Sequence, residues 1–304
     1  MKKLLIIFIV LITSISSKAA GLDPITTKYY IPGSFAVLSK GKVASIIVSD
    51  NDWPGTIRAA KNLQTDLKKV SGIEPSFYTN KVQGMPIIIG TIGKSKLIDE
   101  LISNRRINVS DIAGKWEATL IQVVKNPVKG IDSALVIAGS DKRGTIYGIY
   151  ELASQIGVSP WYYWADVPVK KSNSIFVIAG RHVISSPAVK YRGIFLNDEA
   201  PALSGWSKKE FGGFNSKFYE KVFELILRLK GNYLWPAMWG NAFNDDDKLF
   251  AQLMEVFEKG LPYYYPSVNE AQQKIGILYS TEGNADQIFE HYRSILKGEG
   301  QSIR

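Results

Sequence analysis

Apolar and polar residues follow two different periods between residues 30 and 185. Short β-branched or apolar runs predict strands at residues 44–49, 86–90, 118–124, 133–139 and 174–179. Between these runs, apolar residues recur at every third or fourth position and predict helices at residues 51–71, 95–104 and 142–157. Strands that alternate with helices are typical of layered α/β architectures. The pattern therefore predicts an α/β fold whose N-terminal domain is sandwich-like.

The pattern changes after Ser185, Ser186 and Pro187, which we interpret as a domain boundary. The elements that follow are a strand, a loop, an amphipathic helix, a second strand and a second helix, at residues 191–196, 197–215, 216–230, 233–239 and 245–260. This order predicts the opening of a TIM-type (β/α)8 barrel. Such barrels carry their chemistry at the carboxyl ends of their strands.

The first 20 residues have the features of a signal peptide. Two lysines precede an apolar run over residues 4–12, and small residues lead to Ala20. The apolar run is shorter than the roughly 18 residues of a membrane-spanning helix, so no stable membrane insertion is expected. We therefore expect a cleaved signal at 1–20, a periplasmic or secreted protein, and domains at 21–185 and 186–304.

Charge and composition narrow the classes of partner. The net formal charge is +9, and three of the lysines lie in the first 20 residues. The other basic residues are scattered and form no recognised nucleic-acid motif, so no nucleic acid partner is expected. The chain has no cysteine and two histidines, which argues against disulfides, a histidine-rich metal site or a histidine-based triad. We expect no metal and no cofactor, and the sequence leaves the oligomeric state open.

Polar and aromatic side chains gather after the two expected barrel strands. Asn197, Asp198 and Glu199 follow the first strand, and Trp239 and Asn241 follow the second. Glycosidic bond cleavage commonly uses two carboxyl groups, and aromatic faces suit the apolar faces of sugar rings. The set therefore indicates a carbohydrate site without specifying the sugar. The acidic residues are also suited to capping the structure that follows them.

Two parts of the chain carry a specific resemblance. The sequence from Tyr191 to Trp206, YRGIFLNDEAPALSGW, leads into FYEKVFELILRLKGNYLWPAMWGNAFNDDD at residues 218–247. Upstream lie KRGTIYGIYEL at residues 142–152 and GVSPWYYWADVP at residues 157–168. Over about residues 25–247, the chain resembles glycoside hydrolase family 115.

The resemblance implies an α-glucuronidase that removes glucuronic acid, often 4-O-methylated, from the side chains of glucuronoxylan with inversion at the anomeric carbon. It also implies that Asn197, Asp198 and Glu199 line the sugar site and that Trp239 and Asn241 form its wall. Asp198 is a candidate catalytic residue.

Glu151, in a helix of the first domain, is the candidate for a second catalytic carboxylate that reaches toward Asp198 from outside the barrel. Its structural alternative is a glutamate on the surface of the helix. Trp161, Trp164 and Trp206 are equally compatible with a functional role and with packing between the domains.

The resemblance ends after Asp247, where family members continue to a third strand with paired histidines. This chain instead predicts a loop at 262–266 and a helical tail around 284–296. Residues 188–304 amount to less than half of the about 250 residues of a closed barrel, so we expect the barrel to be incomplete. Three interpretations stay open: an incomplete α-glucuronidase, a non-catalytic secreted carbohydrate-binding protein, or another TIM-barrel glycosidase.

Overall fold

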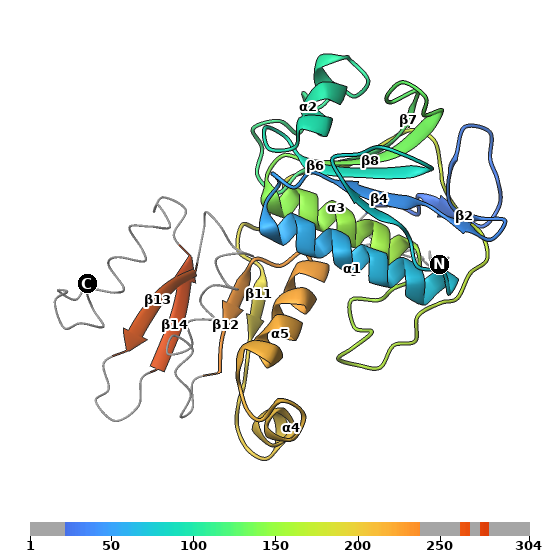
Figure 1. Ribbon diagram of the computed structural model, residues 1–304. Helices are drawn as coiled ribbons and strands as arrows, with labels where there is room; N and C mark the ends of the chain where they lie inside the picture. Colours follow the sequence, from blue (N-terminus) through green and yellow to red (C-terminus); the bar gives the residue numbers. More distant parts are fainter. Residues whose placement is uncertain (1–21, 238–261, 268–273, 280–304) are drawn as a thin grey trace, which may run out of the picture.

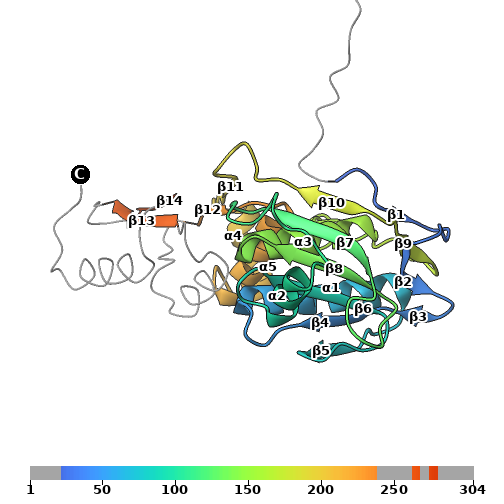
Figure 2. The same ribbon diagram turned by 90° about the horizontal axis from the view of Figure 1, so that it is seen from above.

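A six-stranded sheet lies at the centre of the computed structural model, which describes residues 22–237, 262–267 and 274–279 (Figure 1). Its strands are β4 (Ser45–Val48), β5 (Phe77–Thr79), β6 (Pro86–Thr91), β7 (Thr119–Lys125), β8 (Ser133–Gly139) and β10 (Arg181–Ile184). They run in the order β10-β7-β8-β6-β4-β5, as Figure 2 shows from above. Strands β5, β4, β6 and β8 are parallel, whereas β7 and β10 are antiparallel additions at one edge.

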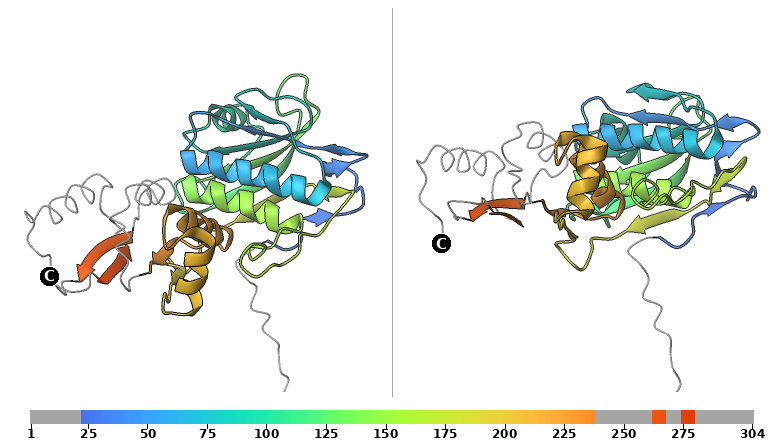
Figure 3. Two further views of the ribbon diagram at one scale, coloured as in Figure 1. Left: turned by 60° about the horizontal axis from the view of Figure 1, so that its bottom comes forward. Right: turned by 90° about the horizontal axis from the view of Figure 1, so that it is seen from below.

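Helices cover both faces of this sheet. Helices α1 (Pro54–Ser71) and α3 (Lys142–Gln155) lie side by side on one face, and α2 (Lys96–Ser103) lies on the other (Figures 1 and 3). The strands supply alternate residues to the two faces, so that Ile46 packs with α1 and α3 while Ile47 packs with α2. The predicted alternation of strands and helices is thus confirmed as a mixed α/β fold.

The three helices of this part lie within a few residues of their predicted positions, and two of them have an end fixed by a cap. The Asp141 carboxylate accepts a hydrogen bond from the backbone N–H of Gly144 at 2.7 Å and starts α3. Gly72, with φ of 78°, ends α1 in the left-handed conformation that glycine favours. The buried face of α1 includes Leu63 and Leu67, as the periodicity predicts.

The structure has a strand where one was expected at residues 174–179, but this strand does not join the central sheet. Strand β9 (Ile175–Val177) belongs to a separate four-stranded sheet with β1 (Thr26–Thr27), β2 (Phe35–Ser39) and β3 (Lys42–Val43). The reason is long-range pairing, because β9 runs antiparallel to both β1 and β2 and pairs Val177 with Thr26 and Phe35. Strand periodicity does not specify such partners.

A parallel pair of strands follows the central sheet. Strands β11 (Gly193–Phe195) and β12 (Tyr233–Trp235) are joined through helices α4 (Ala202–Phe211) and α5 (Ser216–Arg228). The order strand, helix, strand is as predicted, but α4 lies where a loop was expected at residues 197–215. Only Ser207 of α4 is buried, so this helix lacks the apolar stripe from which a helix is recognised.

Residues 262–266 were also expected to form a loop, and the structure shows a strand instead. Strand β13 (Pro262–Ser267) pairs antiparallel with β14 (Lys274–Tyr279), which lies beside β12 (Figure 1). Three consecutive tyrosines favour a strand, and a two-stranded sheet has only edge strands, where proline is tolerated. The helices expected at 245–260 and 284–296 lie outside the described residues.

One hydrophobic core connects the parallel pair to the layers above it. Phe218 and Val222 of α5 belong to the same buried cluster as Leu63 of α1 and Ile149 of α3. The boundary predicted at Ser185 to Pro187 follows the last strand of the central sheet, but apolar packing continues across it. The orientation of β11 and β12 is therefore set by the face of α1 and α3.

Gly193 is required for the parallel pair. A Cβ atom on Gly193 would lie 1.9 Å from the carbonyl oxygen of Tyr233, which is backbone and cannot move aside. We expect Gly193→Ala to lower the free energy of unfolding by about 3 kcal/mol, the upper end of the range typical of overpacking. Chemical denaturation measures this loss. Gly205→Ala is the matched control, because a Cβ on Gly205 meets nothing within 4 Å. Equal effects of the two substitutions would show that the pairing of β11 with β12 is not as described.

Candidate active site

The carboxyl ends of β11 and β12 meet at one edge. Ile194 lies opposite Leu234 and Phe195 opposite Trp235, and the ladder continues because the N–H of Leu196 donates to the carbonyl of Trp235 at 2.9 Å. Residues 197–199 and 236–237 leave the strands at this edge. The structure thus brings the first group of predicted site residues to the carboxyl end of a parallel strand.

Asp198 is the buried member of that group. Its exposed fraction is 3%, whereas Asn197 and Glu199 on either side are exposed. The side-chain oxygen of Asn197 accepts the N–H of Glu199 at 3.2 Å, which closes a tight turn around Asp198. The turn directs Asp198 toward the interior and leaves the neighbouring amide and carboxylate on the surface.

Tyr219 of α5 lies beside Asp198 and was not among the residues expected at the site. The Tyr219 hydroxyl accepts a hydrogen bond from the N–H of Ala237 at 3.0 Å, just after β12. Burial raises the pKa of Tyr219, and the negative charge of Asp198 raises it further, so the phenol stays protonated at neutral pH. In the sequence, Tyr219 follows Phe218 on an apolar helix face and looks like an ordinary core residue.

Two aromatic rings flank this edge on the side away from α5. Phe195 and Trp235 pack edge to face with ring centroids 5.9 Å apart, and Phe195 is 54% exposed. Leu234, which precedes Trp235 in β12, points the other way and joins the buried cluster with α5. An exposed aromatic ring at this edge suits the apolar face of a sugar.

Glu151 does not lie beside Asp198. Its carboxylate contacts the ammonium group of Lys230 at 2.5 Å and accepts the N–H of Leu22 at 3.2 Å. Lys230 precedes β12, so Glu151 is held at the amino ends of the strand pair, while Asp198 follows the carboxyl end of β11. With 4% exposure, Glu151 is also not the surface glutamate of the structural alternative. Burial with a cationic partner explains its position, and we interpret it as a positioning residue.

Glu151 belongs to a line of contacts along α3 that holds the parallel pair. Arg143, Tyr147 and Glu151 follow each other at spacings of four, on one face of the helix. The Tyr147 hydroxyl donates to the carbonyl of Gly231 at 2.8 Å, one residue from Lys230. The contacts of Tyr147 and Glu151 reach the segment just before β12. Arg143 instead contacts a buried carboxylate that also binds residues before β11 and β12.

That shared carboxylate is Glu117, whose side chain is fully buried. It accepts hydrogen bonds from Arg143 at 2.6 Å, Arg192 at 2.5 Å and Asn232 at 2.9 Å. Burial alone would lower the pKa of Arg143, but the Glu117 charge raises it above its ordinary value. Because Arg192 precedes β11 and Asn232 precedes β12, Glu117 fixes the amino ends of both strands against α3.

A second buried ion pair fixes α5. Arg228 contacts Asp66 of α1 at 2.8 Å and Glu224 at 2.8 Å. Burial raises the pKa of Asp66, and the opposing charge of Arg228 lowers it in part. Tyr162 donates to Glu224 at 3.0 Å and completes the cluster. Together these contacts fix the position of α5, the helix that carries Tyr219.

Two of the three tryptophans with an open role are packing residues. Trp164 lies 5.4 Å from Trp206 and 5.9 Å from Phe218, between ring centroids. The Trp164 indole N–H donates to the carbonyl of Lys221. Trp161 stays 43% exposed. Trp164 and Trp206 therefore pack against each other and against α5, while Trp206 stays 36% exposed.

The other predicted wall residues, Trp239 and Asn241, lie outside the described residues. Within the parts of the chain that the structure describes, no three His, Cys, Asp or Glu side chains gather as metal ligands would. None of the helices described here has the length and apolar character that crossing a membrane requires.

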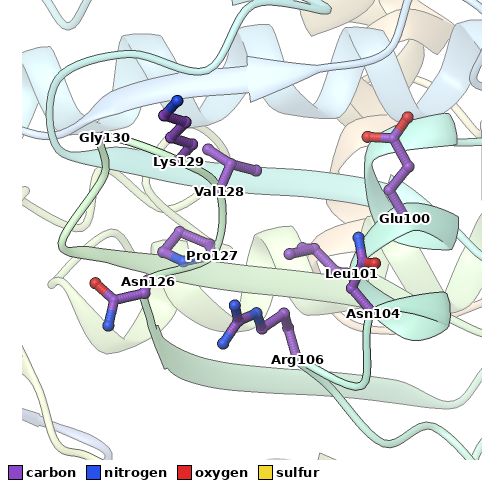
Figure 4. Close-up of a pocket in the computed structure, with 9 residues that line it drawn as sticks. All are labelled: Glu100, Leu101, Asn104, Arg106, Asn126, Pro127, Val128, Lys129 and Gly130. Atoms are coloured by element: carbon purple, nitrogen blue, oxygen red, sulfur yellow. The ribbon is translucent and has the colours of Figure 1, made fainter.

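A separate hollow of about 550 Å³ lies between the end of α2 and the turn from β7 to β8 (Figure 4). Its lining includes Glu100, Arg106 and Lys129. The described residues around it offer one carboxylate and no aromatic ring. It therefore lacks the pair of carboxyl groups that glycoside hydrolysis uses, and we do not assign it as the active site.

Comparison with known proteins finds similarity to one family of glycoside hydrolases. Residues 184–259 match the sequence model of Glycosyl hydrolase family 115. The solved structure of BtGH115A, a family GH115 4-O-methyl-α-glucuronidase with specificity for decorated arabinogalactans, is 33% identical with a TM-score of 0.62. The alignment covers 73% of this chain and 28% of that chain. No curated protein matches the sequence.

Two further solved structures are more distant. A mutant β-hexosaminidase from Streptomyces plicatus is 12% identical with a TM-score of 0.42, covering 71% of this chain and 34% of that chain. A chitobiase from Flavobacterium johnsoniae is 14% identical with a TM-score of 0.39, covering 69% and 25%. At these TM-scores the similarity carries no argument about fold or function.

The family match and the similarity to BtGH115A relate this chain to the glycoside hydrolases. More particularly, the resemblance to glycoside hydrolase family 115 that the sequence predicts is confirmed. The family match extends to residue 259, beyond Asp247, where the resemblance was expected to end. The chain spans 28% of the length of BtGH115A.

Proposed function

We propose that this chain contributes the Asp198 edge of an α-glucuronidase that removes (4-O-methyl-)glucuronic acid side chains from a plant polysaccharide. The observation that supports the proposal is the burial of Asp198. This residue follows β11, a strand of the parallel pair, and lies beside Tyr219 within the segment that matches family 115. In this proposal, β11 and β12 are the first two strands of a (β/α)8 barrel.

The proposed chemistry is hydrolysis with inversion. One carboxyl group protonates the leaving oxygen, and a second, about 6.5–9.5 Å away, activates the attacking water. Asp198 supplies one of the two. Asn197 and Glu199, exposed at the same edge, bind sugar hydroxyl groups. Trp239 and Asn241 form the wall of the sugar site, as the family resemblance implies. Glu151 is not proposed as the second carboxyl, because it lies at the opposite end of the strand pair.

Glucuronoxylan is the substrate that the family resemblance suggests. A decorated arabinogalactan is a second candidate, because BtGH115A is described as specific for such polymers. A glucuronidase acting on either polymer releases a uronic acid. The two candidate polymers differ in the polysaccharide backbone from which the uronic acid is removed. The polysaccharide is therefore decided by contacts beyond the uronic acid itself.

The identity of the released sugar tests this function. We expect the chain to release 4-O-methyl-glucuronic acid or glucuronic acid, measured by anion-exchange chromatography, from one of the two polymers.

Each other product contradicts the proposal in a different way. Release of an N-acetylhexosamine or xylose would identify another barrel glycosidase. Binding of the polymer with no product would identify a non-catalytic carbohydrate-binding protein.

We also propose that the protein is exported through its N-terminal segment to the periplasm or the medium, where a plant polymer is accessible. N-terminal sequencing of protein recovered after export tests this, with Gly21 as the expected first residue. A mature protein that keeps Lys2 and Lys3 would contradict it.

A further inference from the structure

Two adjoining hollows lie beside the four-stranded sheet that contains β1 and β9. The first, of about 290 Å³, is lined by residues 26–28, 154–157, 170–172 and 175. The second, of about 360 Å³, is lined by Lys28 and residues 171–174, so the two hollows share part of their walls. Small-molecule sites typically have volumes of about 300–1,000 Å³. Each hollow is therefore large enough for about one sugar residue.

The walls of these hollows are positively charged. Lys28, Lys170 and Lys171 belong to them, and no Asp or Glu is among the described residues that line either hollow. In the part of the chain that the structure describes, the ammonium groups of Lys28 and Lys170 form no ion pair, hydrogen bond or ring contact. The Lys171 ammonium group donates to the carbonyl of Lys69, which is a neutral acceptor. The three lysines therefore create a positive potential that favours an anion.

The nearest carboxylates along the chain do not cancel this charge. Glu151, one turn before Gln155 in α3, is ion-paired with Lys230 and accepts the side-chain N–H of Gln155 at 2.9 Å. Asp23 and Asp166 are exposed and line neither hollow. The positive charges therefore face a ligand in the hollows without an acidic neighbour in the same walls.

The lysines are also not required to cap α3, although basic side chains often interact with the carbonyl groups at the end of a helix. The carbonyl groups of residues 152–154 accept the N–H groups of Ile156, Val158 and Gly157, respectively. The carbonyl of Gln155 accepts the hydroxyl of Thr26 at 2.9 Å. The last turn of α3 is thus satisfied by other donors, and the ammonium groups remain available to a ligand.

Exposed apolar side chains follow Lys28 directly in the sequence. Tyr29, Tyr30 and Ile31 are 80%, 67% and 41% exposed. Tyr30 packs edge to face on the buried Phe176 of β9, with ring centroids 5.8 Å apart, which holds the ring without covering it. Single exposed apolar residues are common on protein surfaces, whereas a contiguous group marks an interaction site. Exposed tyrosine rings next to lysines suit a ligand that has both anionic groups and sugar rings.

We propose that Lys28, Tyr29, Tyr30, Lys170 and Lys171 form a lysine–tyrosine surface that binds a uronate-bearing segment of a plant polysaccharide. The lysines bind uronate carboxylates, and the tyrosine rings contact neighbouring sugars. The choice of a uronate-bearing polysaccharide among polyanions rests on the proposed function.

The lysine–tyrosine surface is separate from the edge that carries Asp198. In Figure 2, β1 and β9 lie at the end of the molecule away from β11 and β12. A polymer held at this surface stays near the chain, which raises its effective concentration at the cleavage edge. The surface therefore anchors the substrate and takes no part in bond cleavage.

Binding of the whole chain to immobilised glucuronoxylan, measured by biolayer interferometry, tests the proposal. The matched probe is the same polymer with its carboxyl groups reduced to alcohols, which removes the charge and keeps the sugars. We expect the reduced polymer to bind at least about fivefold more weakly, and Lys28→Gln/Lys170→Gln to weaken glucuronoxylan binding about tenfold. Lys81→Gln/Lys125→Gln removes two exposed lysines outside both hollows and is expected to leave binding unchanged.

Three results would overturn the proposal. They are equally tight binding of the reduced polymer, equally tight binding of double-stranded DNA, or equal binding by the two double variants. The first would show that charge is not recognised, the second that any polyanion binds, and the third that these lysines have no special role.

Failure of this surface is distinguishable from failure of the proposed hydrolysis. A short xylooligosaccharide that carries one glucuronic acid does not extend to the lysine–tyrosine surface. We therefore expect Lys28→Gln/Lys170→Gln to release uronic acid from it at the wild-type rate. Absence of release by every protein, with the differences in polymer binding intact, would contradict the hydrolysis alone.

Discussion

Glu117→Ala is expected to lower the free energy of unfolding by about 3–5 kcal/mol, since removal of one partner leaves buried charges uncompensated. The Glu117 carboxylate is fully buried and joins Arg143 to Arg192 at distances of 2.6 and 2.5 Å. Without it, both guanidinium groups lose their carboxylate, and Asn232 loses an acceptor. Urea denaturation followed by circular dichroism measures the loss.

Glu74→Ala is the matched control for this substitution. Glu74 also forms an ion pair, with Lys68, but its side chain is 60% exposed. Solvent screens an exposed pair, so its loss is expected to change stability by less than about 1 kcal/mol. Equal effects at positions 117 and 74 would mean that the buried network does not hold β11 and β12 against α3.

Local sequence patterns predicted the helices of the first part of the chain well. The positions of α1 and α3 follow from apolar spacing together with a cap, Asp141 for α3 and the left-handed Gly72 for α1. Helix α5 was predicted for the same reason, and Phe218 and Val222 on its predicted apolar face are buried. These features depend on neighbouring residues, which a single sequence displays directly.

Long-range partners could not be predicted in this way. The sheet that contains β9 depends on strands about 140 residues earlier, and Glu151 is ion-paired with a lysine 79 residues later. Helix α4 was missed because it buries a single residue, Ser207. In the first two cases the deciding contact joins distant segments, and no local periodicity records it, whereas α4 lacks a local apolar pattern.

The candidate site could be predicted only in part, because one of its residues is placed by contacts between distant segments. Asp198 follows directly from its position after an apolar strand, and the structure buries it at the expected edge. Tyr219 could not be chosen, because only the fold places its hydroxyl against Ala237 and its ring near Asp198. The sequence identified the strand end and the structure identified the phenol beside it.

Asp198→Asn is expected to reduce the release of uronic acid by about 10²–10⁴-fold, to the level of a blank without protein. A catalytic carboxyl group contributes a factor of this size, and asparagine keeps the shape while losing the ability to transfer a proton. The fold is expected to survive, since the substitution changes neither volume nor backbone. Asp132→Asn, at an exposed position before β8, is the control and keeps the wild-type rate.

The direct test of the central claim is uronic acid release from glucuronoxylan and decorated arabinogalactan by the wild-type chain, Asp198→Asn and Asp132→Asn at equal concentrations. The unfolding midpoints of the three proteins are measured alongside, so that loss of fold is separated from loss of chemistry. We expect the wild-type chain and Asp132→Asn to release uronic acid, and folded Asp198→Asn to release none above the blank. Equal release by all three proteins would contradict it, because the Asp198 edge would then not carry the reaction.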